Sequence, residues 1–240
     1  MKIGILAAGI SPAELLPRYG SYADMFVALL GAAEPQLSFR IYEVRHNEFP
    51  AAASDCDGWI ITGSACGVYD DLPWMSRLKA LVLDIYNSDR PLVGICFGHQ
   101  IVASAFGARV EKFEGGWGLG RQRYRIEDEH GFVESERRDF SLNAIHQDQV
   151  LELPENARLF ASSDFCPYAG LVYDDRIFTL QAHPEFRSDF EAELLELRRG
   201  KVIPAEVADA ALATLVSEPP ADSERVAQWM IRFLKAGSGV

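Results

Sequence analysis

The stretch Gly94-Ile95-Cys96-Phe97-Gly98-His99-Gln100 decides how this chain folds, because it joins an apolar segment, residues 91–95, to a helix through one cysteine. A buried strand that enters a helix through Gly-x-Cys-x-Gly is the cysteine form of the nucleophile elbow. The two glycines carry no Cβ, which lets strand and helix approach closely. We therefore predict a central strand over 92–95, a tight turn at Cys96 and a helix that ends at Gly107.

This turn favours a chemical role for Cys96. It lifts the thiol out of the sheet and sets it at a helix N-terminus, where the helix dipole and unpaired amides favour the thiolate. Free cysteine is more often a small buried apolar filler. The flanking glycines, with a strand before and a helix after, favour a covalent catalyst over that alternative.

Strand-like and helix-like segments alternate through the first half of the chain. We predict strands over 2–7, 37–44, 59–61 and 92–95, a helix with a stripe at Tyr22, Phe26, Leu29 and Leu30, and a helix over 72–86. Such alternation predicts an α/β fold with a doubly wound, mostly parallel sheet and a site at the carboxyl ends of its strands. The residues from about 108 to 182 suggest an antiparallel β portion at the sheet edge. Three C-terminal helices are predicted from 188 to about 199, over 205–217 and over 224–236.

A cysteine nucleophile needs a base, and the base needs a group that orients it. Among the 5 histidines, His183 follows the strand-like run 177–180 and precedes a proline and Glu185. Proline favours extended geometry in the residue before it, and residues i and i+2 of an extended segment point the same way. Glu185 is therefore expected beside His183, where it would fix the imidazole tautomer. A surface His-Pro turn with a solvated glutamate is the alternative.

The other histidines and cysteines are not expected to act as the nucleophile or its base. His99 is expected to pack or hydrogen-bond at the elbow, whereas His46 and His130 lie among polar residues and are expected in surface loops. His146 and Asp148 alternate on an extended segment and are expected to share a face. The 4 cysteines are widely spaced without a Cys-x-x-Cys pair, so we predict neither a disulfide framework nor a metal site.

Composition narrows the class of protein. The 240 residues are most simply one domain, with 48% hydrophobic and 24% charged residues, as in ordinary globular proteins. The net charge of −12 argues against nonspecific binding to nucleic acid or to an anionic membrane surface. There is no apolar run of about 18 residues and no secretory signal pattern, so we expect a cytoplasmic protein without a membrane span.

Four motifs in order resemble one family. They are residues 94–100, the His-Pro-Glu at 183–185, the strand and Gly turn at 59–64 followed by 68–74, and the His-x-Asp-x-Val at 146–150. Together they are similar to the class I, triad-type glutamine amidotransferases. The last motif is similar to the amidotransferase domain of GMP synthase. The resemblance spans roughly residues 58–186 and implies a flavodoxin-like fold without a cofactor.

The resemblance also implies roles for individual residues. Cys96 matches the nucleophile, His183 the general acid/base and Glu185 the orienting carboxylate. The amides of Gly63 and Phe97 match the oxyanion hole. Gln100 matches a contact to the amino-acid end of glutamine, while His146 and Asp148 border the site as substrate-binding or structural residues. The implied reaction hydrolyses the glutamine side-chain amide through a γ-glutamyl thioester, giving glutamate and ammonia.

The chain resembles the stand-alone GMP synthase-like amidotransferases, with a core over about 1–187 and a helical extension over about 188–240. It shows no synthase domain or Gly-rich phosphate loop, so an acceptor subunit in trans would have to use the ammonia. Some relatives of this group are γ-glutamyl peptidases, and the triad cannot separate that activity from glutamine hydrolysis. A non-catalytic binding module is the third, least favoured interpretation. Residues that could form the wall on the leaving-group side are Cys66, Val68, Tyr69 and Trp117, with a packing role as the favoured interpretation of Cys66.

Overall fold

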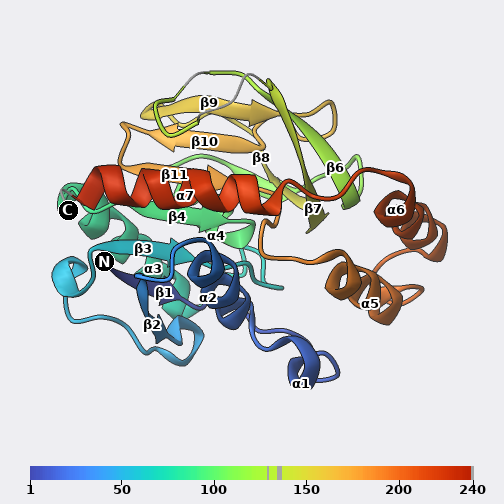
Figure 1. Cartoon of the computed structure of the whole chain (residues 1–240), viewed down its shortest axis with the longest axis horizontal. Coiled ribbons are helices and arrows are strands. Elements are labelled where there is room, and N and C mark those ends of the chain that lie inside the picture. The colour runs from blue at the N-terminus through green and yellow to red at the C-terminus, as the bar shows by residue number, and fades with distance from the viewer. Residues whose placement is uncertain (129, 134–136, 239–240) are drawn as a thin grey trace.

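The structure is a computed structural model that describes residues 1–128, 130–133 and 137–238. A nine-stranded sheet runs through it, with helices on both faces (Figure 1), and a separate two-stranded sheet lies beside it. The strand order of the large sheet is β2-β1-β3-β4-β11-β10-β9-β6-β7. This is the doubly wound α/β architecture that the sequence predicts.

The parallel half of the sheet is built from alternating strands and helices. β1 (Lys2–Leu6), β2 (Ser38–Tyr42), β3 (Gly58–Ile61) and β4 (Leu92–Ile95) all pair in parallel. The helices that connect them are α1 (Leu16–Tyr19), α2 (Tyr22–Ala33) and α3 (Pro73–Asn87), with α4 (Phe97–Ala105) after the elbow. Two short 3-10 turns cover Val44–His46 and Ala53–Asp55. Each predicted strand and helix of this half is present, with ends that differ by a few residues.

The second half of the sheet differs from the prediction at one strand. β10 (Gly170–Tyr173), β9 (Ala157–Ser162), β6 (Gly118–Ile126) and β7 (Asp139–His146) are antiparallel, as predicted. β5 (Val110–Lys112) and β8 (Asp148–Val150) form the small sheet. β11 (Ile177–Leu180), however, pairs in parallel with β4, so an all-antiparallel portion up to residue 182 is wrong. An apolar run of four buried residues carries no signal for strand direction.

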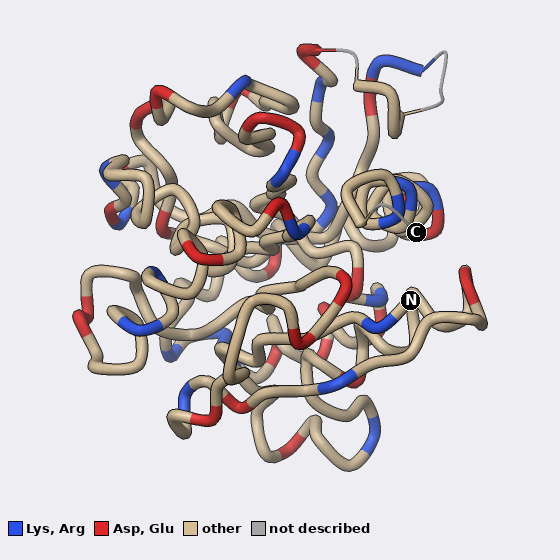
Figure 2. Tube along the Cα trace, turned by 90° about the vertical axis from the view of Figure 1, so that its left-hand side faces the viewer, with Lys and Arg blue, Asp and Glu red and all other residues tan. Residues whose placement is uncertain are grey.

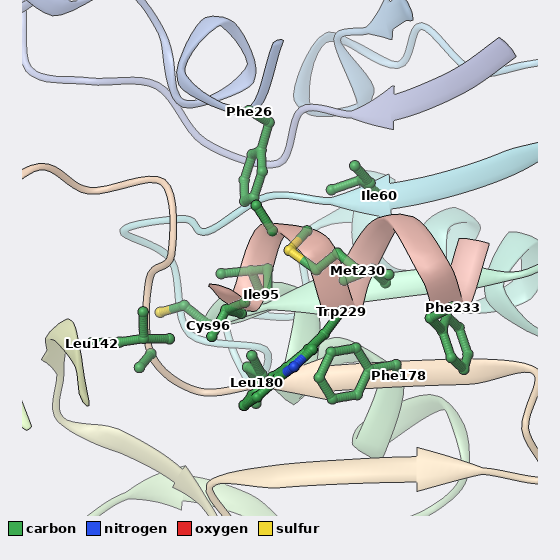
Figure 3. Packing of buried hydrophobic residues seen from close by; sticks show 14 of the residues in the cluster. Phe26, Ile60, Ile95, Cys96, Leu142, Phe178, Leu180, Trp229, Met230 and Phe233 are labelled. Carbon is green, nitrogen blue, oxygen red and sulfur yellow. The ribbon is translucent and has the colours of Figure 1, made fainter. Parts of the chain in front are cut away.

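The last helix belongs to the core. α5 (Ser188–Arg198) and α6 (Ala205–Ser217) pack together at one end of the sheet, and α7 (Ser223–Ser238) crosses the face that also carries α2 (Figure 1). Figure 3 shows Trp229, Met230 and Phe233 of α7 against sheet residues that include Ile95 and Phe178. The predicted C-terminal extension thus contributes one helix, α7, to the hydrophobic core of the sheet. α3 and α4 cover the opposite face.

Charged residues are spread along the whole fold. Figure 2 shows acidic and basic residues interspersed over the trace, with the acidic excess that the net charge of −12 requires. Among the described residues, no helix is long and apolar enough to cross a membrane.

Candidate active site

Cys96 occupies a strained turn between β4 and α4. Its φ of 54° is in the left-handed region, where a residue with a Cβ costs about 1–3 kcal/mol. A Cβ on Gly94 would lie 2.6 Å from the carbonyl oxygen of Gly98, and one on Gly98 would lie 2.4 Å from that of Ile61. Both glycines are thus required by the close approach of strand and helix. The predicted elbow is confirmed, and the thiol lies at the N-terminus of α4 with 6% of the residue exposed.

The parallel pairing of β11 with β4 brings His183 to Cys96. The amide of Cys96 donates to the carbonyl of Leu180 at 2.8 Å, and the chain continues from there to His183. A Cβ on Gly63, after β3, would lie 2.9 Å from Cε1 of His183 and 3.7 Å from Cβ of Cys96. The ends of β3, β4 and β11 therefore meet at one point. A side chain at residue 63 would displace the imidazole of His183.

Glu185 contacts His183 as the extended pattern predicts. Nδ1 of His183 donates to Oε1 of Glu185 at 2.8 Å, and the imidazole stacks on the ring of Phe186 with centroids 3.9 Å apart. Both members of this pair are buried, with 2% of His183 and 4% of Glu185 exposed. The alternative of a solvated surface turn is wrong.

The charges around His183 favour its protonated form. Burial by itself lowers the pKa of His183, but the neighbouring Glu185 and Cys96 outweigh burial and raise the pKa well above its ordinary value. Because Nδ1 is engaged by Glu185, only Nε2 is left to exchange a proton with Cys96. This nitrogen has no hydrogen-bond partner among the described residues. This geometry is the one that a cysteine nucleophile, its base and an orienting carboxylate require.

A cavity of about 530 Å³ opens beside Cys96. Three of the four predicted wall residues line it, namely Cys66, Tyr69 and Trp117. Val68 does not, because its side chain turns into the core against α3 and is 5% exposed. The small-sheet strand β8 and the end of β7 complete the wall.

The three predicted substrate-binding residues form one connected wall. Nε2 of Gln100 donates to the carbonyl of Asp148 at 2.9 Å and to Oε1 of Gln181 at 3.0 Å. Nδ1 of His146 donates to the same carbonyl at 3.1 Å, and the Asp148 carboxylate accepts from the Tyr69 hydroxyl at 3.0 Å. All three line the cavity. Since the Gln100 amide nitrogen is already engaged, only its Oε1 remains for a ligand.

Burial sets the protonation of this wall. It lowers the pKa of His146 to about 4, so this imidazole is neutral near pH 7. It also raises the pKa of Asp148 above its ordinary value. His146 therefore acts as a neutral hydrogen-bonding group, and any charge that a ligand meets comes from other residues of the cavity wall.

The structure also shows where His99 and His130 lie. His99 is fully buried and hydrogen-bonds through Nδ1 to Oγ1 of Thr179 at 2.8 Å, which confirms a structural contact beneath the elbow. Burial lowers its pKa to about 3. His130 is not a surface residue: it is 7% exposed and stacks on Phe132 with centroids 5.4 Å apart. The residues next to it in the sequence are polar and indicate a surface loop, whereas the fold places His130 in an aromatic cluster.

Two basic side chains of the cavity were not predicted from the sequence. Arg198, in the last turn of α5, and Lys112, at the end of β5, both line it. The Arg198 side chain makes no hydrogen bond or ion pair within the described part of the chain. Nothing in the local sequence separates Arg198 from its neighbour Arg199, which pairs with Asp209. Within residues 1–128, 130–133 and 137–238 there is no group of three or more His, Cys, Asp or Glu that could hold a metal ion.

The known proteins with sequences similar to this chain agree on one family. A family model described as "Glutamine amidotransferase class-I" matches residues 18–198. A glutamine amidotransferase-like protein of Schizosaccharomyces pombe is 31% identical over 97% of this chain and 98% of its own length. Gamma-glutamyl peptidase 3 of Arabidopsis thaliana is 30% identical over 84% of each chain. A subunit of the glutamine-hydrolyzing GMP synthase of Archaeoglobus fulgidus is 32% identical over 58% of this chain and 73% of its own.

Solved structures agree on the fold. The structure of a glutamine amidotransferase from Thermotoga maritima superimposes with a TM-score of 0.74 over 99% of both chains, at 20% sequence identity. One from Methylobacillus flagellatus gives 0.73 over 98% of this chain and 94% of its own, at 21% identity.

Proposed function

The chain belongs to the class I glutamine amidotransferases and is an amide-hydrolysing enzyme, and we propose that it hydrolyses the side-chain amide of glutamine through Cys96, His183 and Glu185. The products are glutamate and ammonia. The observation that carries the proposal is the buried His183–Glu185 hydrogen bond, which leaves Nε2 free beside the elbow cysteine.

The reaction follows from the positions of these groups. The Cys96 thiolate attacks the amide carbon of the substrate, and the carbonyl oxygen becomes an oxyanion. The amide of Phe97, first in α4, has no partner inside the helix and is suited to hold it together with the amide of Gly63. Protonated His183 gives its proton to the leaving nitrogen, so ammonia departs and a γ-glutamyl thioester remains. Water then gives a proton to the neutral His183 and adds to the thioester carbon, and the C–S bond breaks, which releases glutamate and restores the Cys96 thiolate beside protonated His183.

A γ-glutamyl peptide is the second candidate substrate. The cavity volume of about 530 Å³ lies in the range of about 300–1,000 Å³ that is typical of small-molecule sites, so it has room for a peptide larger than glutamine. Arg198 and Lys112 would supply positive charge for the carboxylates of such a peptide. Three relatives whose matches cover 74–92% of this chain are named gamma-glutamyl peptidases of Arabidopsis thaliana. The thioester step is the same, with the peptide amine as leaving group.

Glutamine hydrolysis with use of the ammonia would need an acceptor subunit in trans. The relatives named as glutamine-hydrolyzing GMP synthase subunits support this arrangement, whereas peptide cleavage needs no partner. Cytoplasmic location stays a prediction of the sequence.

Glutamate release by the purified protein tests the proposal, with glutamine, γ-glutamyl dipeptides and glutathione as parallel substrates. Cys96→Ala should abolish release. Cys56→Ala is the matched control, because Cys56 is a buried free cysteine outside the cavity, and its replacement should leave turnover close to that of the unaltered enzyme. Preference for glutamine supports the amidotransferase, and preference for peptides the peptidase. Equal loss in both variants, or full activity in Cys96→Ala, would refute the assignment of the nucleophile.

A further inference from the structure

A buried arginine lies behind the triad, away from the cavity. Arg121 of β6 is 6% exposed. Its guanidinium makes two hydrogen bonds to neutral partners and also faces the buried carboxyl of Glu191. Nη1 donates to Oδ1 of Asn143 at 2.7 Å, and Nη2 donates to Oγ of Ser188 at 2.9 Å. A buried charge is costly, and an apolar side chain would fill the same space at lower cost. The arginine therefore has a task beyond packing.

Asn143 of β7 holds both ends of the segment that carries the triad. Its backbone carbonyl accepts from the amide of His183 at 2.8 Å, in an isolated antiparallel bridge. Its side-chain Nδ2 donates to the carbonyl of Phe186 at 2.7 Å. The loop from His183 to Phe186 is thus fastened at its first and last residue by one asparagine. Inside that loop, Glu185 reaches Nδ1 of His183.

The side-chain amide of Asn143 needs a hydrogen-bond donor beside its oxygen, and Arg121 supplies that donor. An amide side chain both accepts and donates, and its two ends must face the right partners. Arg121 can only donate, so its bond to Oδ1 fixes which end is the oxygen and turns Nδ2 toward Phe186. Ser188, at the start of α5, holds the second arm of the guanidinium fork in place. Arg121 thus contacts Asn143, and Asn143 in turn contacts the loop from His183 to Phe186.

We propose that Arg121 and Asn143 are positioning residues for the reaction: they clamp the His183–Phe186 loop in the shape that presents His183 to Cys96. The inference rests on the proposed function, since it assigns a role to the base of that reaction. A shift of about 1 Å at a catalytic group costs about 100-fold in rate. Loss of the clamp should therefore lower kcat about 100-fold and leave KM nearly unchanged, because neither residue lines the cavity.

The test compares Asn143→Ala, Arg121→Lys and Ser188→Ala with a matched control, Thr214→Ala. The Thr214 hydroxyl accepts the backbone N–H of Arg121 at 2.8 Å, so its removal perturbs the same part of β6 and leaves the guanidinium contacts in place. We expect kcat to fall about 100-fold in Asn143→Ala, nearly as far in Arg121→Lys, and less in Ser188→Ala. The control should lose thermal stability without a change in kcat.

A second readout does not depend on the substrate. The rate at which iodoacetamide alkylates Cys96, followed by peptide mapping against pH, reports how His183 supports the thiolate. The clamp variants should move this profile to higher pH, and Thr214→Ala should not. If the unaltered enzyme releases no glutamate, the proposed function fails, and the alkylation profile still decides on the clamp.

The outcomes are distinct. Folded Asn143→Ala or Arg121→Lys with the kcat and alkylation profile of the unaltered enzyme would overturn the clamp. If Asn143→Ala does not fold, Arg121→Lys and Ser188→Ala decide in its place, because they remove one or two hydrogen bonds and keep the backbone bridge. Losses of stability alone, in step with Thr214→Ala, would reduce the clamp to ordinary packing.

Discussion

Replacing Glu191 with glutamine should remove a strong pH dependence of folding stability. Glu191 of α5 is 0% exposed, and neither of its carboxyl oxygens has a hydrogen-bond partner among the described residues. Burial raises its pKa from 4.5 to about 8, and the charge of Glu185 adds to the rise. The positive charges of His183 and Arg198 act in the opposite direction, and Arg121 also faces Glu191 from β6. Burial is the largest of these effects.

The size of the effect follows from proton binding. In the unfolded chain Glu191 loses its proton near pH 4.5, whereas the native protein keeps it until about pH 8. Between these values the native state binds one more proton, so stability falls by about 1.4 kcal/mol per pH unit. The contribution is complete below pH 4.5 and is lost as the pH rises through about 8. Between pH 5 and 8 the unaltered protein should lose about 3–4 kcal/mol that the neutral glutamine variant does not lose.

Urea unfolding at pH 5 to 9, with reductant for the free cysteines, measures this difference. The quantity of interest is the free energy of unfolding of the unaltered protein minus that of Glu191→Gln, followed against pH. Glu193→Gln is the control, because Glu193 lies in the same helix but is partly exposed and pairs with Arg18. Its difference should be nearly constant above pH 6.

A difference for Glu191→Gln that stays constant within about 0.5 kcal/mol from pH 5 to 8 would contradict a protonated Glu191 in the native protein. Glu191 would then be ionised in the native state, with Arg121 or Arg198 as its counter-charge. Glutamine has nearly the same shape as the protonated carboxyl, so a large loss of stability already at pH 5 would contradict the protonated state as well.

Two further predictions concern turnover. Glu185→Gln keeps the volume at Nδ1 of His183 but removes the charge that raises its pKa, so kcat should fall about 10³-fold or more in steady-state assays; activity within tenfold of the unaltered enzyme would contradict its orienting role. Arg198→Leu should raise KM about tenfold or more for carboxylate-bearing substrates and change kcat little, since hydrogen bonds to charged groups contribute about 1.5–3 kcal/mol. Arg199→Leu, next in the chain and outside the cavity, is its control, and equal KM values in the two variants would exclude Arg198 from substrate binding.

Several features could be predicted from neighbouring residues because they depend on local geometry. The elbow follows from two glycines around Cys96, since no other residue allows that approach of strand and helix. The contact between His183 and Glu185 follows from the two-residue period of an extended segment. The alternation of strands and helices in the first hundred residues follows from hydrophobic periodicity in the same way.

Other features could not be predicted because they join distant segments. The apolar run of β11 is equally compatible with a parallel and an antiparallel neighbour, and only its insertion beside β4 selects the parallel one. His130 is buried because Phe132 and Phe160 come together around it. α7 is part of the core because its apolar face meets strands more than a hundred residues earlier, such as β3.

Residues within a few positions of one another specify the turn at Cys96, the contact between His183 and Glu185 and the fold class, so these features can be read from the chain alone. The assembled fold is needed to see that the ends of β3, β4 and β11 meet, that Arg198 lines the cavity, and that Arg121 reaches Asn143. These contacts depend on strand order and on which buried groups must share one space. Local periodicity encodes neither, and packing of the whole chain settles both.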